Sequence, residues 1–417
     1  MRIHFTFDIV CPFAWVASQR VRALAEEAGA ELVLQPVLLG GLLKAIGSPT
    51  VPMDAMSDAK WRIVRTDALR QGAWHGVPVA WPSHHPQRTV DAMRLIVAAP
   101  PERQFDLATD LFRAYWVDGR DVASPVVLAQ VADAHGLDPA IGRTPEAKAA
   151  LFTSTRSATE AGVFGVPTLR IGDGPDTPLF WGVDRLDAAR AALGLPDEPP
   201  RDGGVRGRRL VLFHDFASPF SYLGHVASER VAAAAGAELE VVPILLGALF
   251  HQLGGPLVPI ATFSDRKQQY VHADLARLAQ AAGVRLRWPT AFPLRTVVAL
   301  RVAVQEPATT GALYEAAWCD DLDVSRPEVV TGVLQRAGFE GERLVAGAAD
   351  PTVKAQLRRN TERALAAGAC GAPTFVVDDT HLFWGQDRLA QVHATLTGWQ
   401  PPTAPRLDPE GALGDSR

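Results

Sequence analysis

Two short stretches of this chain combine residue types that could carry out sulfur chemistry. In the first, Cys11 is followed by Pro12, and in the second, Ser218 is followed by Pro219. Proline is favoured at the first position of a helix, because its missing N–H would be unpaired there in any case. The residue before it then lies at a helix N-terminus, where unpaired N–H groups and the positive end of the helix dipole stabilise an anion. The pattern therefore predicts a stabilised thiolate, on Cys11 itself or on a bound thiol beside Ser218.

Both stretches belong to a repeat that covers most of the chain. Cys11 aligns with Ser218, and the same register also aligns Lys60 with Lys267. Further along, the segment 165–168 aligns with 371–374, and 180–186 aligns with 383–389. Ordered matches over such a length indicate a tandem duplication of one domain. We expect copy one at 1–195, a Pro- and Gly-rich linker at 196–208, copy two at 209–399 and a loose tail at 400–417.

Within each copy, the pattern of apolar residues predicts alternating strands and helices. The expected elements of copy one are strands at 3–7, 31–39 and 169–171, helices at 59–71, 89–98, 105–116 and 126–135, and a closing helix from Asp184. Strand–helix–strand, then a helical stretch, then two strands and a helix is typical of an α/β fold whose sheet is covered on both faces. The predicted fold class is two tandem thioredoxin-like domains, each with an inserted all-helical subdomain.

A proline opens the last part of the sheet in each copy. Pro167 and Pro373 each stand between a Gly-x pair and a threonine, just before an apolar strand. In a thioredoxin-like fold this loop faces the helix that begins after Cys11 or Ser218. We predict cis bonds there, which leave the main chain of Val166 and Ala372 free to pair with an extended, peptide-like ligand.

Composition narrows the class of protein. The 41 basic and 46 acidic residues give a formal net charge of −5, without runs of like charge, which argues against a nucleic-acid or membrane surface. The chain starts without a typical secretory signal, and its apolar runs are too short for a membrane span. Three cysteines do not make a disulfide framework, and the 11 histidines show no metal-ligand spacing. We expect a cytoplasmic protein without a metal.

Five motifs occur in the same order in the two copies, the first of them with Cys11 in place of the serine in copy one, and they resemble those of 2-hydroxychromene-2-carboxylate isomerases and kappa-class glutathione transferases. Both groups are related to the DsbA-like disulfide oxidoreductases. The motifs are the S-P-F-S-Y start at 218–222, a P-x-x-L-G turn, a Lys-x6-Asp-x2-Arg helix, the G-x-P-T loop and a final W-G-x-D-R-L. The resemblance covers almost the whole chain and implies glutathione, or another low-molecular-weight thiol, as cofactor.

The resemblance also implies a role for each matching residue. Ser218 would hold the glutathione sulfur as a thiolate. The other implied contacts are with the carboxylate of the tripeptide (Lys60, Lys267), its cysteinyl main chain (Val166 with Pro167, Ala372 with Pro373) and its γ-glutamyl amino group (Asp184, Asp387). Such a ligand needs a cation, an anion and a backbone edge, and these residue types supply them. Without the resemblance, the lysines would be read as solvated and the aspartates as helix caps.

Two departures from the family pattern leave alternatives open. Arg88 and Arg295 stand where the family commonly has Asn. Each arginine would bind a substrate carboxylate or, alternatively, brace the start of a helix. Cys11 replaces the family serine, and Cys11-Pro12-Phe13-Ala14 resembles the start of omega-class glutathione transferases, in which the cysteine forms a mixed disulfide. A cysteine at a helix N-terminus is expected to have a lowered pKa. Ala14 and Ser221 occupy the place of a resolving cysteine, so dithiol exchange is not expected.

The predicted activity is therefore that of a glutathione-dependent cis–trans isomerase acting on a small molecule from aromatic-compound breakdown. The resemblance implies that thiolate addition, bond rotation and thiolate departure bring about the isomerisation. The alternatives are a kappa-like transferase, a thiol-disulfide oxidoreductase that uses Cys11, or a copy that serves only as a scaffold. The two copies would form an intramolecular pair like the two subunits of a dimer.

Overall fold

The computed structural model describes residues 1–174 and 177–403. These residues form two compact units, each considered separately below. Unit 1 comprises Met1–Met56 and Arg65–Pro199, and unit 2 comprises Ser57–Val64 and Pro200–Pro401. The segment Ser57–Val64 belongs to the first copy by sequence, yet it packs as part of unit 2. Of the predicted tail 400–417, the part from residue 404 onward lies outside the described residues.

Unit 1 is built on a four-stranded mixed sheet with the strand order β2-β1-β3-β4. Strand β1 (Arg2–Phe7) pairs in parallel with β2 (Glu31–Pro36) and antiparallel with β3 (Thr168–Ile171), which pairs with β4 (Leu179–Trp181). Its α-helices are α1 (Pro12–Glu27), α2 (Leu39–Ala45), the part of α3 (Asp58–Trp74) from Arg65 onward, α4 (Val90–Ala98), α5 (Pro101–Trp116), α6 (Pro125–Ala134), α7 (Pro145–Glu160) and α8 (Leu186–Ala192). Short 3-10 turns are η1 (Pro52–Ala55), η2 (Pro139–Arg143) and η3 (Val183–Arg185).

Unit 2 repeats this architecture with the order β6-β5-β7-β8. Its strands are β5 (Arg209–His214), β6 (Glu238–Pro243), β7 (Thr374–Val377) and β8 (His381–Trp384). Its α-helices are α9 (Pro219–Ala235), α10 (Leu246–Gln252), α11 (Asp265–Ala282), α12 (Val297–Gln305), α13 (Thr310–Trp318), α14 (Pro327–Arg336), α15 (Gly341–Gly347), α16 (Pro351–Ala367) and α17 (Leu389–Leu396). The 3-10 turns are η4 (Pro259–Thr262), η5 (Pro307–Thr309) and η6 (Gln386–Arg388).

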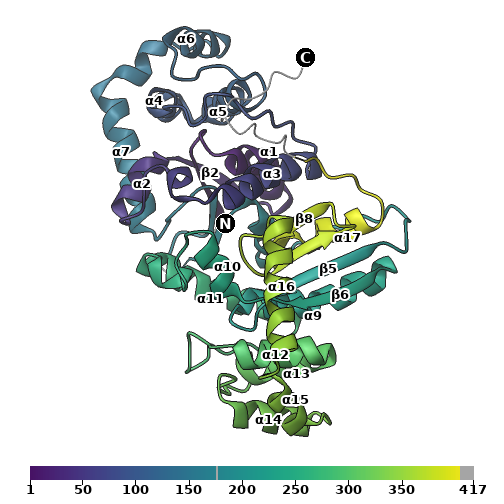
Figure 1. The fold of residues 1–417 in the computed structure, drawn as a ribbon. Coiled ribbons are helices and arrows are strands. Elements are labelled where there is room, and N and C mark those ends of the chain that lie inside the picture. The colour runs from purple at the N-terminus through teal and green to yellow at the C-terminus, as the bar shows by residue number, and fades with distance from the viewer. Residues whose placement is uncertain (175–176, 404–417) are drawn as a thin grey trace. The chain divides into compact units, whose positions relative to one another are not determined.

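The predicted fold class is thus confirmed, including the helical insert between the two halves of each sheet. Figure 1 shows the insert helices α13 to α15 grouped apart from the sheet of unit 2, while α12 contacts β6 and α16 runs from that group onto the sheet. Helix α7 was not predicted from the sequence, because only Ala147, Leu151 and Ala158 of this helix are buried and its apolar periodicity is weak. Its N-cap Thr144 accepts a hydrogen bond from the N–H of Ala147.

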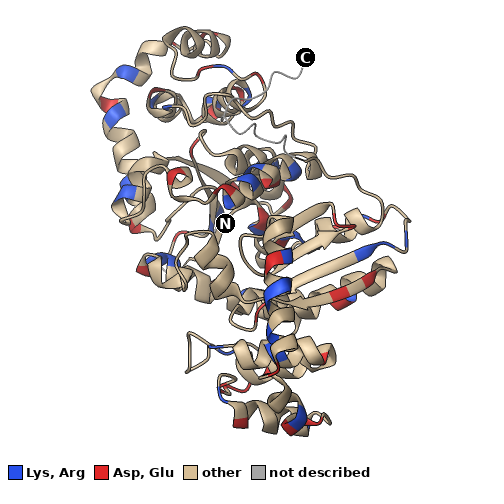
Figure 2. Cartoon of the chain, in the orientation of Figure 1, with Lys and Arg blue, Asp and Glu red and all other residues tan. Residues whose placement is uncertain are grey.

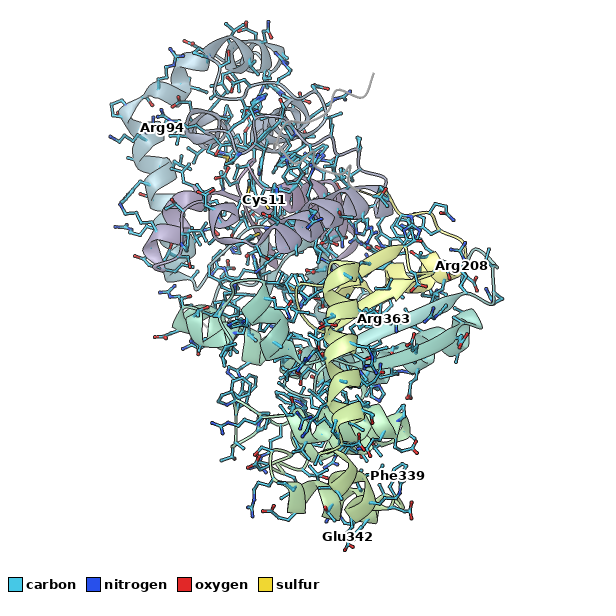
Figure 3. All side chains as sticks on the ribbon, in the orientation of Figure 1. Cys11, Arg94, Arg208, Phe339, Glu342 and Arg363 are labelled. Atoms are coloured by element: carbon cyan, nitrogen blue, oxygen red, sulfur yellow. The ribbon has the colours of Figure 1, made fainter. Side chains whose placement is uncertain are left out.

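Ion pairs also fix the helices to the sheet. Arg363 of α16, labelled in Figure 3, makes two hydrogen bonds of 2.6 and 2.9 Å to the carboxylate of Glu240 on β6. Figure 2 shows basic and acidic segments interspersed over the elements of both units. No described helix has both the length and the apolar character needed to cross a membrane.

Candidate active sites at two helix N-termini

In unit 2, Ser218 lies at the N-cap of α9 as predicted. Its hydroxyl donates a hydrogen bond of 3.0 Å to the carbonyl oxygen of Ala372 and accepts one of 3.2 Å from the N–H of Ser221. The Ala372–Pro373 peptide bond is cis, which confirms that prediction. The sheet ladder ends with the pair of Phe213 and Thr374, so Ala372 lies just outside it. The loop and the helix N-terminus therefore face each other across one hydroxyl.

In unit 1, Cys11 takes the equivalent place at the N-cap of α1, among the elements of that unit (Figure 3). Its thiol donates a 3.3 Å hydrogen bond to the carbonyl oxygen of Val166, and the Val166–Pro167 bond is cis as well. The two copies thus repeat one contact with different chemical groups.

The pKa of Cys11 differs from the expectation. Burial raises it to about 12, although the N–H groups of Phe13 and Ala14 favour the thiolate. Cys11 is only 8% exposed, so the free-energy cost of removing its thiolate from water exceeds the stabilisation that the helix N-terminus provides. The carboxyl group of Asp8 adds a repulsive contribution. Cys11 is therefore a neutral thiol at physiological pH in this structure.

Each site is held by a buried aspartate that the sequence analysis did not select. Asp215 accepts hydrogen bonds from the N–H of Ala217 (2.9 Å), the N–H of Leu246 at the start of α10 (2.8 Å) and the hydroxyl of Thr296 before α12 (2.6 Å). Burial raises the pKa of its carboxyl group, and these three donors oppose that effect. One side chain thus ties the end of β5 to two helix starts.

Unit 1 repeats this anchor. Asp8 accepts from the N–H groups of Val10 (3.1 Å) and Leu39 (2.8 Å) and from the hydroxyl of Thr89 (2.8 Å). The sequence signal was an aspartate three residues before Cys11 and Ser218 in both copies.

Two tryptophans of the inserts fix the backbone just before the site residues. The indole N–H of Trp116 donates to the carbonyl of Ile9, and that of Trp318 donates to the carbonyl of Phe216, each at 2.8 Å. The inserted helices therefore help to set the position of Cys11 and Ser218, which is a reason for the insert to be part of the fold.

A second pair of tryptophans packs against the glycines of the proline loops. A β-carbon at Gly165 would lie 2.6 Å from the indole nitrogen of Trp181, and one at Gly371 would lie 2.7 Å from that of Trp384. Real β-carbons essentially never come that close, so this approach requires glycine. The contact places the loop against the strand β4 or β8 that follows it.

Lys267 and Lys60 both belong to unit 2, and the charge of Lys60 acts on Lys267. The pKa of Lys267 is lowered to about 8, first by burial and second by the charge of Lys60. The Lys267 ammonium lies 3.9 Å from the ring centre of Phe263, and the Lys60 ammonium lies 5.7 Å from that of Trp384. The positive charge of Lys60 also reaches the Cys370 thiol, whose pKa burial raises to about 12. Two cations thus gather in the unit that holds Ser218.

The remaining predicted residues occupy helix starts. Asp184 lies in η3 and pairs with Arg185 at 3.5 Å, and Asp387 lies in η6 and accepts a hydrogen bond from the Gln386 side chain. Arg88 and Arg295 are exposed and each directly precedes the threonine that bonds the anchoring aspartate. The described residues contain no group of three His, Cys, Asp or Glu side chains that could hold a metal ion.

The sequence matches the profile of the DsbA-like thioredoxin domain twice, at residues 2–194 and 209–397. This chain belongs to that family. Within the family, the chain is 27% identical over 198 residues to 2-hydroxychromene-2-carboxylate isomerase of Pseudomonas putida, a match that covers 46% of this chain and 95% of the relative. It is 28% identical over 229 residues to glutathione S-transferase kappa 1 of Homo sapiens, covering 49% of this chain and 98% of the relative.

Solved structures with similar folds include a 2-hydroxychromene-2-carboxylate isomerase. That structure has 26% sequence identity and a TM-score of 0.42, and the match covers 46% of this chain and 95% of the other. The two curated relatives named above each match about half of this chain.

Proposed function

We propose that unit 2 is a glutathione-dependent isomerase of the 2-hydroxychromene-2-carboxylate isomerase type, with Ser218 as the residue that holds the thiol. The observation that carries this proposal is the Ser218 hydroxyl at the N-cap of α9, 3.0 Å from the carbonyl oxygen of Ala372. A hydroxyl at this place can turn from the carbonyl to donate to a thiolate. The similarity to isomerases named above supports the reaction type.

The residues of unit 2 fit the charges of glutathione. Lys267 and Lys60 provide positive charge for carboxylates. Burial and the charge of Lys60 lower the pKa of Lys267, and a bound carboxylate would raise it again. Ala372 lies outside the sheet ladder, where its main chain can pair with an extended peptide. Asp387 provides an acid for an amino group. Glutathione itself would supply the nucleophilic sulfur.

The protein itself would ionise the bound thiol and orient it toward the substrate. The start of α9 and the Ser218 hydroxyl lower the pKa of a bound thiol, and the loop fixes its direction. Arg295, exposed beside Thr296, would bind the carboxylate of the substrate. No change of oxidation state is required of the protein.

The kappa-type transferase is the second candidate, because 28% identity links this chain to such an enzyme. It would use the same Ser218 site for conjugation. Exchange chemistry at Cys11 has less support, since burial raises the pKa of its thiol to about 12. Unit 1 then serves as a scaffold or binds ligands without a thiolate of its own.

The test has two parts. Calorimetric titration with glutathione should give one site that Lys267→Ala weakens strongly and Lys60→Ala weakens less, whereas Arg266→Ala, on the exposed neighbour of Lys267, leaves it unchanged. Turnover of 2-hydroxychromene-2-carboxylate should then depend on glutathione, and conjugation of 1-chloro-2,4-dinitrobenzene should be slower. Glutathione binding without isomerisation but with conjugation would favour the transferase, and an absence of glutathione binding would overturn both.

A further inference from the structure

A cavity of about 360 Å³ lies in unit 2 on the side of α9 that faces β6 and the start of α13. Its walls include Tyr222 and Val226 from α9, Val241 from β6, Pro307 from η5 and Gly311 from the start of α13. This volume falls in the range of small-molecule sites. Neither Ser218 nor the proline loop lines it, so it is separate from the site described above.

A buried histidine forms part of the cavity wall. His225 is only 6% exposed, and its Nδ1 has no hydrogen-bond partner among the described residues. Its Nε2 lies 3.9 Å from Glu229 Oε1, beyond hydrogen-bond distance, and 3.9 Å from where a β-carbon on Gly311 would lie. The Nε2 edge therefore faces the cavity at Gly311. Burial lowers the pKa of His225, so the ring is neutral and can exchange one hydrogen bond with a ligand.

The charge of the wall has one sign. Among the described residues, Glu229 and Glu315 are the only charged side chains that line the cavity, since His225 is neutral. Neither carboxylate pairs with a lysine or an arginine among the described residues. Two unpaired carboxylates above an apolar floor attract a cation that carries an apolar group.

The first copy fills the corresponding place with its own side chains. Arg22, which aligns with Glu229, stacks 3.7 Å from the ring centre of Phe105 and pairs with Asp106 at 2.7 Å. Phe105 and Asp106 align with Pro307 and Ala308 of unit 2, and Arg113 aligns with Glu315. Unit 2 has therefore lost the aromatic ring and reversed both charges at the cavity.

We propose that this cavity of unit 2 binds a small organic ammonium compound, with its cation between Glu229 and Glu315 and its apolar part against Val226, Val241 and Tyr222. The Tyr222 hydroxyl is already bonded to the sulfur of Cys319 at 3.2 Å, which leaves the ring as an apolar wall. The Nε2 edge of His225 selects a ligand with one polar group beside the apolar part.

The probe is 2-phenylethylamine, which is a cation at neutral pH, titrated into the full chain by calorimetry. Phenylacetate and 2-phenylethanol share its ring and chain but replace the cation by an anion and by a neutral group. We expect binding of the amine, weaker binding of the alcohol and none of the acid. Equal binding of all three, or no binding of the amine at millimolar concentration, would overturn the proposal.

Substitutions in the cavity wall test whether the amine binds there. The double substitution Glu229→Gln with Glu315→Gln should weaken amine binding at least about tenfold, as expected for the loss of charge-assisted hydrogen bonds. Glu342→Gln, on the exposed α15 residue labelled in Figure 3, is the matched control and should change nothing. Gly311→Leu should fill the cavity and abolish binding, with circular dichroism to show that the variant is folded.

A second readout does not depend on those substitutions. The ring signals of His225 in NMR spectra, identified by their loss in His225→Phe, should shift when the amine is added. Ser218→Ala should leave both the shift and the calorimetric affinity unchanged, because the two sites are separate. Loss of amine binding in Ser218→Ala would instead place the amine in the thiol site and refute the separate cavity site.

Discussion

The hydroxyl of Ser218 and the carbonyl oxygen of Ala372 lie 3.0 Å apart, and the thiol of Cys11 and the carbonyl oxygen of Val166 lie 3.3 Å apart in the equivalent place. One arrangement thus carries an oxygen in one unit and a sulfur in the other. In the proposed function, the thiol of glutathione binds beside the Ser218 hydroxyl of unit 2.

Replacing Ser218 should impair catalysis much more than replacing Cys11. Ser218→Ala removes a donor to the developing thiolate, and the loss of such a donor commonly costs about 10²-fold in turnover. It also removes the N-cap hydrogen bond with Ser221, which costs about 1 kcal/mol of stability. Steady-state kinetics and thermal unfolding should both be measured. Ser218→Thr should restore activity, and Cys11→Ala should retain it. Equal loss in Ser218→Ala and Cys11→Ala would contradict the assignment.

Cys11 should react slowly with alkylating agents in the folded protein. Its pKa of about 12 keeps it in the thiol form, and it is 8% exposed. Iodoacetamide at pH 7.5, followed by peptide mass spectrometry, should label Cys319, which is partly exposed, before Cys11 and Cys370. In urea all three should react alike. Preferential labelling of Cys11 in the folded protein would show that it is an activated nucleophile after all.

Lys267 should make the stability of unit 2 depend on pH. Its folded pKa is about 8 and its usual value is 10.5, so the unfolded chain binds more protons between these values. The free energy of unfolding should therefore rise with pH across that window, by at most about 3 kcal/mol from this group. The thiols with raised pKa values act in the opposite direction above pH 9, which makes a reference variant necessary.

That reference is Lys267→Met. The difference in unfolding free energy between Lys267→Met and the wild type should favour the variant at pH 7 and vanish near pH 10.5. Bound glutathione should flatten this difference, because a carboxylate beside Lys267 raises its pKa. A difference that stays constant with pH would mean that Lys267 titrates normally.

Asp215 and Asp8 should each stabilise only their own unit. Asp215→Ala leaves buried donors unpaired, at a cost of about 3 kcal/mol. Hydrogen exchange should then accelerate in peptides of β5 and α12 but not in β1, and Asp8→Ala should show the reverse. Asp320→Ala, which breaks an exposed ion pair with Arg285, is the control and should have almost no effect. Faster exchange in both units after one substitution would contradict independent anchors.

Much of this architecture could be predicted from the sequence, for specific reasons. Because the chain repeats its motifs, it was possible to predict two copies, the cap position of Ser218 and the cis loops at Pro167 and Pro373. Local residue types determine those features. The anchors Asp8 and Asp215 occupy matching places in the two copies, but their partners, such as Thr89 and Thr296, are distant in sequence, so the local pattern does not predict the bonds that they make.

The electrostatic properties were the least predictable. A helix N-terminus alone suggests a lowered pKa for Cys11, but the extent of burial decides the direction, and burial follows from packing of the whole unit. Likewise, Lys60 lies in the first copy by sequence but in unit 2 by packing. Its effect on the pKa of Lys267 could not be read from the alignment.

Trp181 and Trp384 pack closely against Gly165 and Gly371 because these glycines have no side chain. A β-carbon there would lie 2.6 and 2.7 Å, respectively, from the indole nitrogen. Every missense change in a glycine codon adds at least one carbon atom. A saturation library of this gene should therefore yield only synonymous codons among the fully active clones at Gly371. Fully active clones with other residues at Gly165 would show that activity does not depend on the equivalent contact in unit 1.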